Sequence, residues 1–367
     1  MKKINLGQKE LIHFVGIGGI GMSGLSLIMK GQGFQVQGSD LTNNKNIDRL
    51  KKEKIKFFLG HSKKNLKDAT IVVISSAIKN TNPDVVHTWM PHSDLIGGII
   101  AKIAGVKYIL WEVVASNLDS DVMNFTSRMI VKLNAYLSGI LPNKIIYCAK
   151  SAIQVHEQKG FKKEKSIFIP IGFNISENSN IKSSNQEDIF TIGCVARWDR
   201  QKNHRNLLEA LKILDDKEIN YHCLMASIGI DDTNPELKQV IDEVGNNRDK
   251  LSLLGYIDDI NDIFSKIDLN ILPSSGEAFP NIIAESMAKG ILCVGTDVGD
   301  IADIIGEYGW IVPKKDPNAL ANAIVIAISE FKNPSWSKKS EGAKQQIKLN
   351  YPLQKMINSY HDVWDKN

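Results

Sequence analysis

Short apolar segments rich in β-branched residues alternate with amphipathic segments along nearly the whole chain. This alternation predicts parallel β-sheets with helices on both faces, because neighbouring parallel strands are connected through a helix. The expected strands are residues 12–15, 34–37, 71–75, 108–113, 144–148, 190–195, 222–226, 251–254, 269–272 and 292–294. Helical patterns fall between most of them, for example at residues 203–214, 281–289 and 318–331. A polar stretch at residues 176–188 then divides the chain into two α/β halves of similar size.

One place breaks the alternation. Residues 84–87 also have a strand pattern, only about eight residues after the strand that ends at Ser75, and Pro83 lies between the two. A parallel crossover needs roughly a dozen residues or more. Either one of the two segments is not a strand, or the pair is antiparallel, or the strand order in the sheet is unusual.

The composition is that of a globular protein. A length of 367 residues is enough for two or three cores, and 43% hydrophobic with 23% charged residues excludes wholesale disorder and a coiled coil. The four cysteines are far apart and form no CxxC pair. This pattern argues against a disulfide framework or a zinc site, and it favours a reducing compartment.

The net charge of +4 is unevenly spread, since residues 1–80 carry 14 Lys and Arg against 5 Asp and Glu. Such a face could meet an acidic membrane surface or a phosphate, or it could be an ordinary solvated lysine-rich surface. We expect no membrane span, because the apolar stretch 11–29 is punctuated by glycines and His13, and the stretch 95–111 by Lys102 and Lys107. The sequence predicts a cytoplasmic protein. Peripheral contact with the inner face of a membrane through the basic N-terminal segment stays open.

Residues 13–24 predict a strand that runs into a glycine-rich loop and then a helix. Gly18, Gly19 and Gly21 would let the backbone approach a diphosphate at the helix N-terminus. Asp40 ends the second strand, where its carboxylate could meet a sugar or ribose hydroxyl. The alternative is that the glycines serve tight packing of the helix on the strand.

This loop, residues 38–41 and residues 73–78 resemble the N-terminal domain of UDP-N-acetylmuramate–L-alanine ligases, which holds the UDP part of their substrate. The resemblance covers about residues 10–84. The ligases also need a phosphate loop for ATP, but no GKT or GKS occurs anywhere in this sequence. Ligation is therefore not expected.

A second constellation lies in the C-terminal half. Residues 192–204 predict a strand, a loop and a helix start that place Arg197 and Lys202 at the carboxyl end of a parallel sheet, where open α/β sheets bind ligands. Two cations there suit a diphosphate leaving group in place of a metal ion. The backbone around Gly255 follows another strand and could pair with a base edge. The alternative for the cations is an ordinary basic rim.

Residues 273–285 predict a loop that leads into a helix. Gly276 frees the loop and Pro280 opens the helix. Glu277 and Glu285 stand eight residues apart, so they could address different parts of one elongated ligand. The alternative for Glu285 is a solvated position on the helix.

Together with residues 290–299 and 309–313, these segments are similar to the donor domain of glycosyltransferase family 4, whose members have two-domain GT-B folds. The resemblance runs over about residues 84–360. It implies Glu277 at the donor sugar, Glu285 at the ribose, and Arg197 with Lys202 at the diphosphate. It also implies a retaining transfer from a UDP-sugar, and no cofactor is expected. We expect no metal requirement, because no Asp-x-Asp motif stands at a strand end beside the presumed diphosphate, where Arg197 and Lys202 supply two positive charges. The loop and helix start would add donor-binding residues at Ser275, Gly276, Phe279, Pro280 and Asn281.

The acceptor side departs from that family, because its first strands and glycine-rich loop are absent and the ligase-like segment occupies their place. Residues 112–115 (Glu-Val-Val-Ala) stand near a strand end where members often carry a histidine. His87 and His92 are the remaining candidate polar contacts, and His92 is counted with the binding residues.

We therefore expect an α/β fold of two Rossmann-like domains facing a cleft, with a C-terminal helix near residues 353–365 that returns to the first domain. The expected units are residues 1–84, 84–174, 175–345 and 346–367. The ligase-like unit should join residues 84–150 in one continuous sheet, irregular at residues 76–90, with the loop 16–21 facing the cleft. If these parts do not pair, the second half would be a truncated transferase.

The expected function is transfer of a sugar from a UDP-sugar to a sugar or lipid-linked acceptor in cell-envelope biosynthesis, without nucleic acid. One alternative is a chimeric chain that binds a UDP-sugar without turnover, which becomes the favoured reading if the first two units do not pair. Another is a ligase-related fragment of peptidoglycan synthesis.

Overall fold

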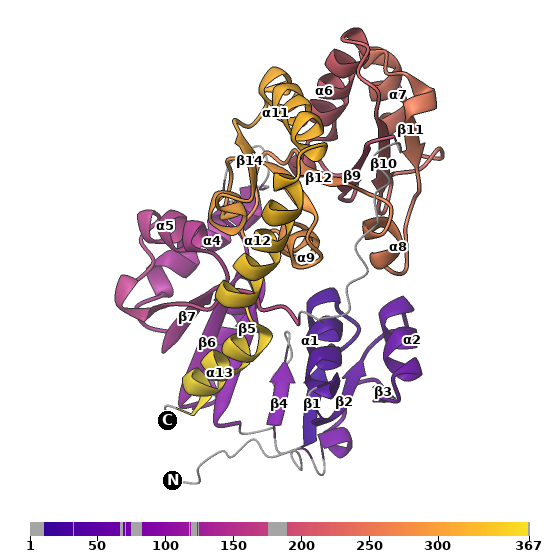
Figure 1. Cartoon of the computed structure of the whole chain (residues 1–367). Coiled ribbons are helices and arrows are strands. Elements are labelled where there is room, and N and C mark those ends of the chain that lie inside the picture. The colour runs from indigo at the N-terminus through magenta and orange to yellow at the C-terminus, as the bar shows by residue number, and fades with distance from the viewer. Residues whose placement is uncertain are drawn as a thin grey trace.

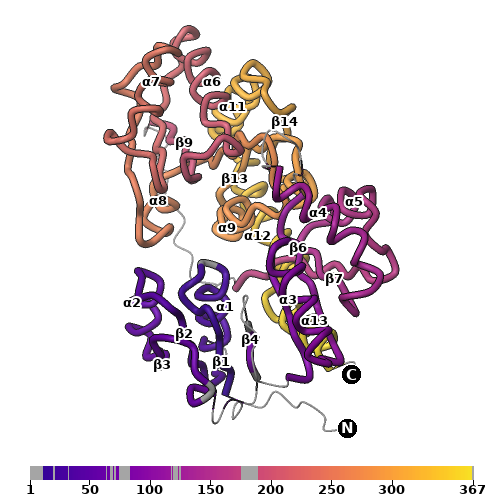
Figure 2. Tube along the Cα trace, turned by 180° about the vertical axis from the view of Figure 1, so that it is seen from behind, coloured from indigo at the N-terminus to yellow at the C-terminus, as the bar shows by residue number. Residues whose placement is uncertain are grey.

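The computed structural model describes residues 11–31, 33–66, 69, 71–74, 83–116, 118, 123, 125–174 and 189–365. These residues form three parallel sheets with helices packed on them (Figures 1 and 2). The expected α/β class is confirmed. The proposed linker at residues 176–188 lies outside the described residues.

The first sheet has the strand order β3-β2-β1-β4. Its elements are β1 (Leu11–Val15), α1 (Ile20–Gly31), β2 (Gln35–Asp40), α2 (Lys45–Lys52), β3 (Lys56–Leu59) and β4 (Ile71–Ile74). Strand β1 is covered on both faces, because Ile12 and Phe14 are buried with Leu50 of α2 on one face and His13 and Val15 are buried on the other. The short strand β3 was not expected from the sequence.

The second sheet has the order β5-β6-β7-β8. Its elements are β5 (Val85–Trp89), α3 (Pro91–Ile103), β6 (Tyr108–Val113), α4 (Phe125–Leu137), β7 (Lys144–Tyr147), α5 (Lys150–Gln158) and β8 (Ser166–Phe168). The segment near residue 85 is thus a strand despite its short distance from β4. Because consecutive strands are neighbours, the right-handed crossovers put α3 and α4 on one face, and α13 (Leu353–Trp364) covers the other (Figure 2).

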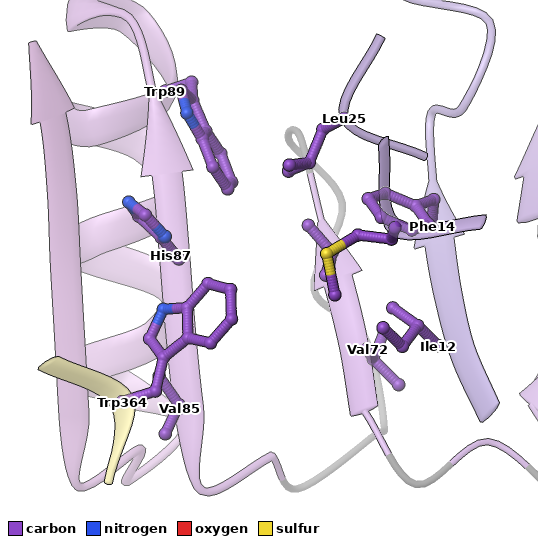
Figure 3. Close-up of a pocket in the computed structure, with 10 residues that line it drawn as sticks. Ile12, Phe14, Leu25, Val72, Val85, His87, Trp89 and Trp364 are labelled. Carbon is purple, nitrogen blue, oxygen red and sulfur yellow. The ribbon is translucent and has the colours of Figure 1, made fainter. Parts of the chain in front are cut away.

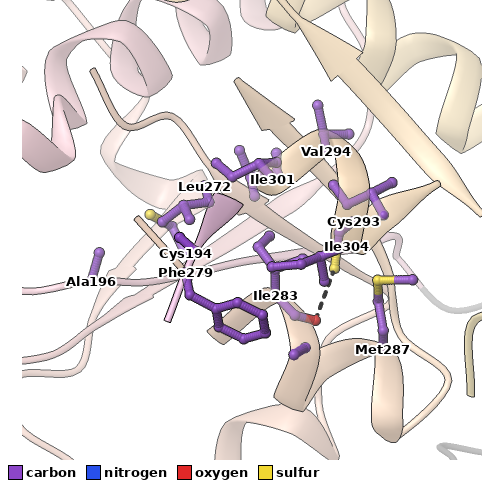
Figure 4. Packing of buried hydrophobic residues seen from close by; sticks show 14 of the residues in the cluster. Cys194, Ala196, Leu272, Phe279, Ile283, Met287, Cys293, Val294, Ile301 and Ile304 are labelled. Atoms are coloured by element: carbon purple, nitrogen blue, oxygen red, sulfur yellow. Dashed lines mark hydrogen bonds between the residues drawn. The ribbon is translucent and has the colours of Figure 1, made fainter. Parts of the chain in front are cut away.

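The third sheet, with the order β11-β10-β9-β12-β13-β14, forms the C-terminal domain. Its strands are β9 (Thr191–Val195), β10 (His222–Ala226), β11 (Leu251–Leu253), β12 (Leu269–Leu272), β13 (Leu292–Thr296) and β14 (Gly309–Val312). Its helices are α6 (His204–Asp216), α7 (Pro235–Val244), α8 (Asn261–Phe264), α9 (Asn281–Ala288), α10 (Ile301–Ile305), α11 (Pro317–Phe331) and α12 (Ser335–Asn350). Ile283 and Met287 of α9 pack on Cys293 and Ile304 in its core (Figure 4).

The expectation of one continuous N-terminal sheet is wrong. Among the described strands, β4 pairs only with β1, and β5 pairs only with β6. Paired strands lie about 4.8 Å apart, but here His87, Trp89 and Trp364 project into the space between β4 and β5 and line a cavity of about 70 Å³ (Figure 3). Trp89 packs against the core of the first sheet, so the two parts meet through side chains.

The expected return of the C-terminal helix is confirmed. The crossing is made by Phe173, whose N–H donates to the Tyr351 carbonyl at 2.8 Å and whose carbonyl accepts from the Leu353 N–H at 3.0 Å. Tyr360 and Trp364 of α13 then pack on the second sheet. No helix among the described residues combines the length and the apolar character that a membrane crossing requires.

Candidate functional site

The loop between β12 and α9 carries the strongest candidate side chain, the buried Glu277. Lys202 Nζ lies 2.5 Å from Glu277 Oε1, and the Ser274 hydroxyl donates to the same oxygen at 2.6 Å. Lys202 ends a short 3₁₀ helix (Arg200–Lys202) that follows β9, the strand beside β12. The carboxyl ends of two neighbouring strands thus bring together two residues that the sequence assigned to one donor site, and the ion pair compensates for the burial of the carboxylate.

The loop itself is fixed from two sides. The Ser275 N–H donates to the Gln201 carbonyl at 2.7 Å, and the Gln201 side chain donates to the Gly276 carbonyl. From the N-terminal part of the molecule, the Ser116 hydroxyl donates to the Glu277 carbonyl. The loop is therefore held in place both by the 3₁₀ helix and by the segment that follows β6.

The turn before α10 supports the same loop. Gly299 has φ +60°, and a side chain at this position would collide with the carbonyl oxygens of Glu277 and Ala278. The Asp300 N–H donates to the Ala278 carbonyl at 2.9 Å. Only glycine combines this backbone conformation with so close an approach.

Asp300 also joins the two halves of the molecule. Its buried carboxylate accepts from the N–H groups of Lys150 at 2.6 Å and Ser151 at 2.9 Å, and so caps the N-terminus of α5. On the surface beside it, Lys150 Nζ pairs with Asp303 at 2.8 Å. Asp300 thus holds both the loop after β12, through its backbone N–H, and helix α5, through its carboxylate.

Glu285 lies in α9, which starts at Asn281 directly after Pro280, as the sequence predicted. Glu285 is half-buried, and burial raises the pKa of its carboxyl group. The first turn of α9 has no acidic residue, so its N–H groups and the exposed Asn281 stay favourable for an anion.

Three expected contacts have other partners in the structure. Arg197 is 63% exposed and pairs with Asp199 at 3.3 Å. The Gly255 N–H donates to the Ile230 carbonyl at 2.8 Å, so this group is already used and does not face a base edge. Phe279 is buried against Phe173 and Tyr351, with ring centroids 6.1 and 5.3 Å away, and thus contributes to packing at the domain crossing.

The glycine-rich loop after β1 is closed by its own side chains. The Gly18 N–H donates to Asp40 Oδ2 at 2.9 Å, and the Gly18 carbonyl accepts from Asn44 at 3.1 Å and Asn46 at 2.8 Å. The Gly19 N–H donates to the Gly16 carbonyl at 3.1 Å. Asp40 therefore holds the loop instead of projecting toward a ribose.

The open part of the loop is at α1. A side chain at Gly21 would meet nothing within 4 Å. Helix α1 begins at the end of the first sheet nearest α8 and α9 (Figures 1 and 2).

The two candidate histidines differ. His87 is buried, with Nε2 3.1 Å from Glu112, and the hydroxyl of Tyr360 donates to the other Glu112 oxygen at 2.9 Å. This cluster attaches α13 to β5 and β6, so His87 helps to hold the fold together. His92 is exposed on the first turn of α3.

Comparison with solved structures decides the fold. A glycosyltransferase from Rickettsia africae ESF-5 superposes with a TM-score of 0.75 at 20% identity, covering 98% of this chain and 100% of that one. Anabaena Alr3699/HepE, solved in complex with UDP, has a TM-score of 0.75 at 16% identity, covering 98% and 100%. The chain has the GT-B fold. Both structures extend over the ligase-like unit, which thus takes the place of the first strands of a GT-B enzyme.

Two family models match separate parts of the sequence. Residues 189–330 match the model described as "Glycosyl transferases group 1", and residues 11–96 match "Mur ligase family, catalytic domain". The UDP-N-acetylmuramate–L-alanine ligase of Pelagibacter ubique (strain HTCC1062) is 69% identical over 106 residues, which are 28% of this chain and 23% of the ligase. The corresponding ligase of Bartonella bacilliformis is 48% identical over 93 residues, which are 25% of this chain and 19% of that ligase. The chain thus spans about a fifth of the length of the curated relatives it matches.

Proposed function

We propose that the protein transfers a sugar from a UDP-sugar to an acceptor hydroxyl, with retention of the anomeric configuration and without a metal ion. The observation that carries this proposal is the cluster of Lys202, Glu277 and Ser274 at the carboxyl ends of β9 and β12, inside the segment that matches the glycosyltransferase model. The same fold in Anabaena Alr3699/HepE was solved with UDP-glucose.

In the proposed reaction, the bond between the anomeric carbon and the diphosphate oxygen breaks while a bond to the acceptor oxygen forms. The acceptor hydroxyl gives up its proton to the departing diphosphate. Lys202 and the N-terminus of α9 stabilise the charge on that leaving group. Glu277 accepts hydrogen bonds from the sugar hydroxyls once Lys202 turns toward the diphosphate, and Glu285 binds the ribose. Arg197 would have to leave Asp199 to assist.

The second candidate is binding of a UDP-sugar without turnover. The absence of pairing between the described strands of the first two sheets favours it. We nevertheless place the transferase first, because the superposed glycosyltransferase structure covers 98% of this chain, the ligase-like unit included. The third candidate, a ligase-related fragment, has only the likeness of residues 11–96 and the curated ligases in its favour.

The deciding experiment measures UDP release from a panel of UDP-sugars, with and without sugar and lipid-linked acceptors. UDP release that requires an acceptor supports the transferase. Calorimetric binding of UDP without any release supports the binding protein.

Two variants test the roles of the glutamates. Glu285→Ala should weaken UDP binding about tenfold to a hundredfold, because a hydrogen bond to a charged group contributes roughly 1.5–3 kcal/mol. Glu277→Ala should lower turnover more than UDP affinity, since UDP has no donor sugar. Glu341→Ala, at an exposed position on α12, is the matched control and should change neither. An unchanged UDP affinity in the Glu285 variant would remove the ribose assignment.

We place this activity in the cytoplasm, with an acceptor from cell-envelope synthesis. The free, buried state of all four cysteines and the likeness of residues 11–96 to a peptidoglycan ligase support this placement.

A further inference from the structure

Helices α3 and α4 pack against each other on the face of the second sheet opposite α13 (Figure 2), and both expose apolar side chains. On α3, Ile96, Ile99 and Ile103 follow one another at helical spacing and are exposed, Ile103 by 82%. Helix α4 continues this surface with a second exposed stripe, formed by Phe125, Met129, Leu133 and Tyr136. We call these seven residues the α3–α4 face. Single exposed apolar residues are normal in soluble proteins, but two adjacent stripes mark a contact surface.

The helices cannot turn to bury this face. Gly97 and Gly98 of α3 lie so close to the sheet that a Cβ atom would come within 2.7 Å of Thr88 Cγ2 and 2.8 Å of Trp111 Nε1. On α4, the Asn134 side chain donates to the Pro91 carbonyl at 2.8 Å and so fixes the rotation of one helix against the other. The apolar stripes are therefore a fixed feature of the fold.

The exposed charged side chains on these two helices are all positive. Lys102 and Lys132 are exposed, whereas the acidic residue of α3, Asp94, is buried and accepts a hydrogen bond from Thr88 at 2.6 Å. Helix α4 has no acidic residue. An apolar stripe with lysines at its border is the pattern of helices that lie in the interface of an anionic membrane, with the ammonium groups among the lipid headgroups.

We infer that the α3–α4 face docks on the surface of an anionic lipid bilayer. Helix α3 starts at the carboxyl end of β5, the end of the second sheet from which Ser116 reaches the Glu277 loop. A docked molecule therefore holds this end of the sheet beside the headgroups. Delivery of a lipid-linked acceptor to that cleft rests on the proposed function, whereas docking itself does not. The α3–α4 face consists of other residues than the basic N-terminal segment that the sequence suggested.

The test is co-sedimentation of the full chain with two kinds of vesicle, pure phosphatidylcholine and phosphatidylcholine with about 30 mol% phosphatidylglycerol. Wild-type protein should pellet with the anionic vesicles and far less with the neutral ones, and added salt should weaken the binding. The double variants Ile99→Ser/Ile103→Ser and Lys102→Glu/Lys132→Glu should each bind about tenfold more weakly or worse.

Matched controls lie on α12, where Leu349→Ser removes a 72% exposed apolar side chain and Lys338→Glu reverses an exposed lysine. Both controls should bind vesicles like wild type. All of these positions are exposed, so the variants should keep the melting temperature and the UDP affinity of wild type. These two measurements separate a loss of docking from a loss of folding or of the donor site.

Three results would overturn the inference. One is wild-type protein that stays in the supernatant with both kinds of vesicle. Another is binding that survives both α3–α4 variants and is lost only in Lys2→Glu/Lys3→Glu, which would assign the contact to the N-terminal segment. The third is a dimer in sedimentation velocity that Phe125→Ser dissociates, which would make this face an interface between copies. None of these results depends on sugar transfer.

Discussion

Replacing Asp300 by alanine should loosen the contact between the two halves of the molecule. The substitution removes the acceptor of two hydrogen bonds, from Lys150 N–H at 2.6 Å and Ser151 N–H at 2.9 Å. The residue that precedes α5, Ala149, provides no side-chain cap of its own. The first turn of α5 therefore loses a buried carboxylate that also complements the helix dipole.

The size of the effect follows from the geometry. A hydrogen bond to a charged group contributes roughly 1.5–3 kcal/mol, and losing an N-cap costs about 0.5–2 kcal/mol. These two values describe the same contacts and are not added. Water can also bond to the freed N–H groups of α5, which reduces the loss. We therefore expect Asp300→Ala to lower the free energy of unfolding by about 2–3 kcal/mol. The Asp300 backbone N–H keeps its hydrogen bond to the Ala278 carbonyl in this variant, so the loop that carries Glu277 should retain its UDP affinity. Turnover should fall more, because the proposed transfer needs both halves of the molecule together.

The assay combines urea denaturation, which reports the free energy of unfolding, with small-angle scattering, which reports separation of the domains. Asp303→Ala is the matched control, because it removes a surface ion pair whose side chains are 61% and 49% exposed. Such pairs contribute about 0–1 kcal/mol. Asp300→Asn keeps one acceptor oxygen, so its free energy of unfolding should lie between those of Asp300→Ala and Asp303→Ala. Equal, small effects of Asp300→Ala and Asp303→Ala, with unchanged scattering, would refute the reasoning.

Further predictions concern the donor site and the buried groups. UDP-sugar turnover should be unaffected by EDTA, and activity lost to EDTA and restored by magnesium would contradict the role given to Lys202. Gly299→Ala should lower the free energy of unfolding by about 1–3 kcal/mol, measured by urea denaturation, because its backbone is left-handed and has no room for a side chain. Burial raises the pKa of the Asp94 carboxyl well above 3.8, so the folded state keeps a proton that the unfolded state releases, and stability falls as the pH rises above that value. The Asp94→Asn variant should thus gain stability over wild type in thermal melts at pH 7, and the gain should vanish near pH 4; a constant difference would contradict this. Burial also raises the pKa of the Cys194 and Cys293 thiols to about 12, so thiol reagents should label them only on unfolding, and rapid labelling of the native protein would be the opposite result.

Much of the framework was predictable because it depends on local pattern. Apolar runs at regular spacing predicted most strands, and Pro280 marked the start of α9 within one residue. Lys202 and Glu277 could be predicted as neighbours because each follows a strand of one parallel sheet, and such strands end at the same edge.

Contacts between distant elements were not predictable in this way. Ser116 meets the Glu277 carbonyl across 161 positions of sequence, and nothing near either residue marks the pairing. Asp300 has the position of an N-cap for its own helix but caps α5 instead. The gap between β4 and β5 depends on how much space His87, Trp89 and Trp364 fill, and a pattern of apolar positions contains no information on that volume.

The way in which the first two sheets meet has a consequence for how such a chain can arise. Strand pairing demands an exact register, since a slip of one residue turns every side chain to the opposite face. Contact between apolar side chains is non-directional and only has to fill space. Because β4 and β5 share no ladder among the described residues, the ligase-like unit has to match its neighbour in volume and not in strand register. The seam is thus a tolerant site for exchange of gene segments, and other nucleotide-binding units with an apolar edge should be graftable at the same point.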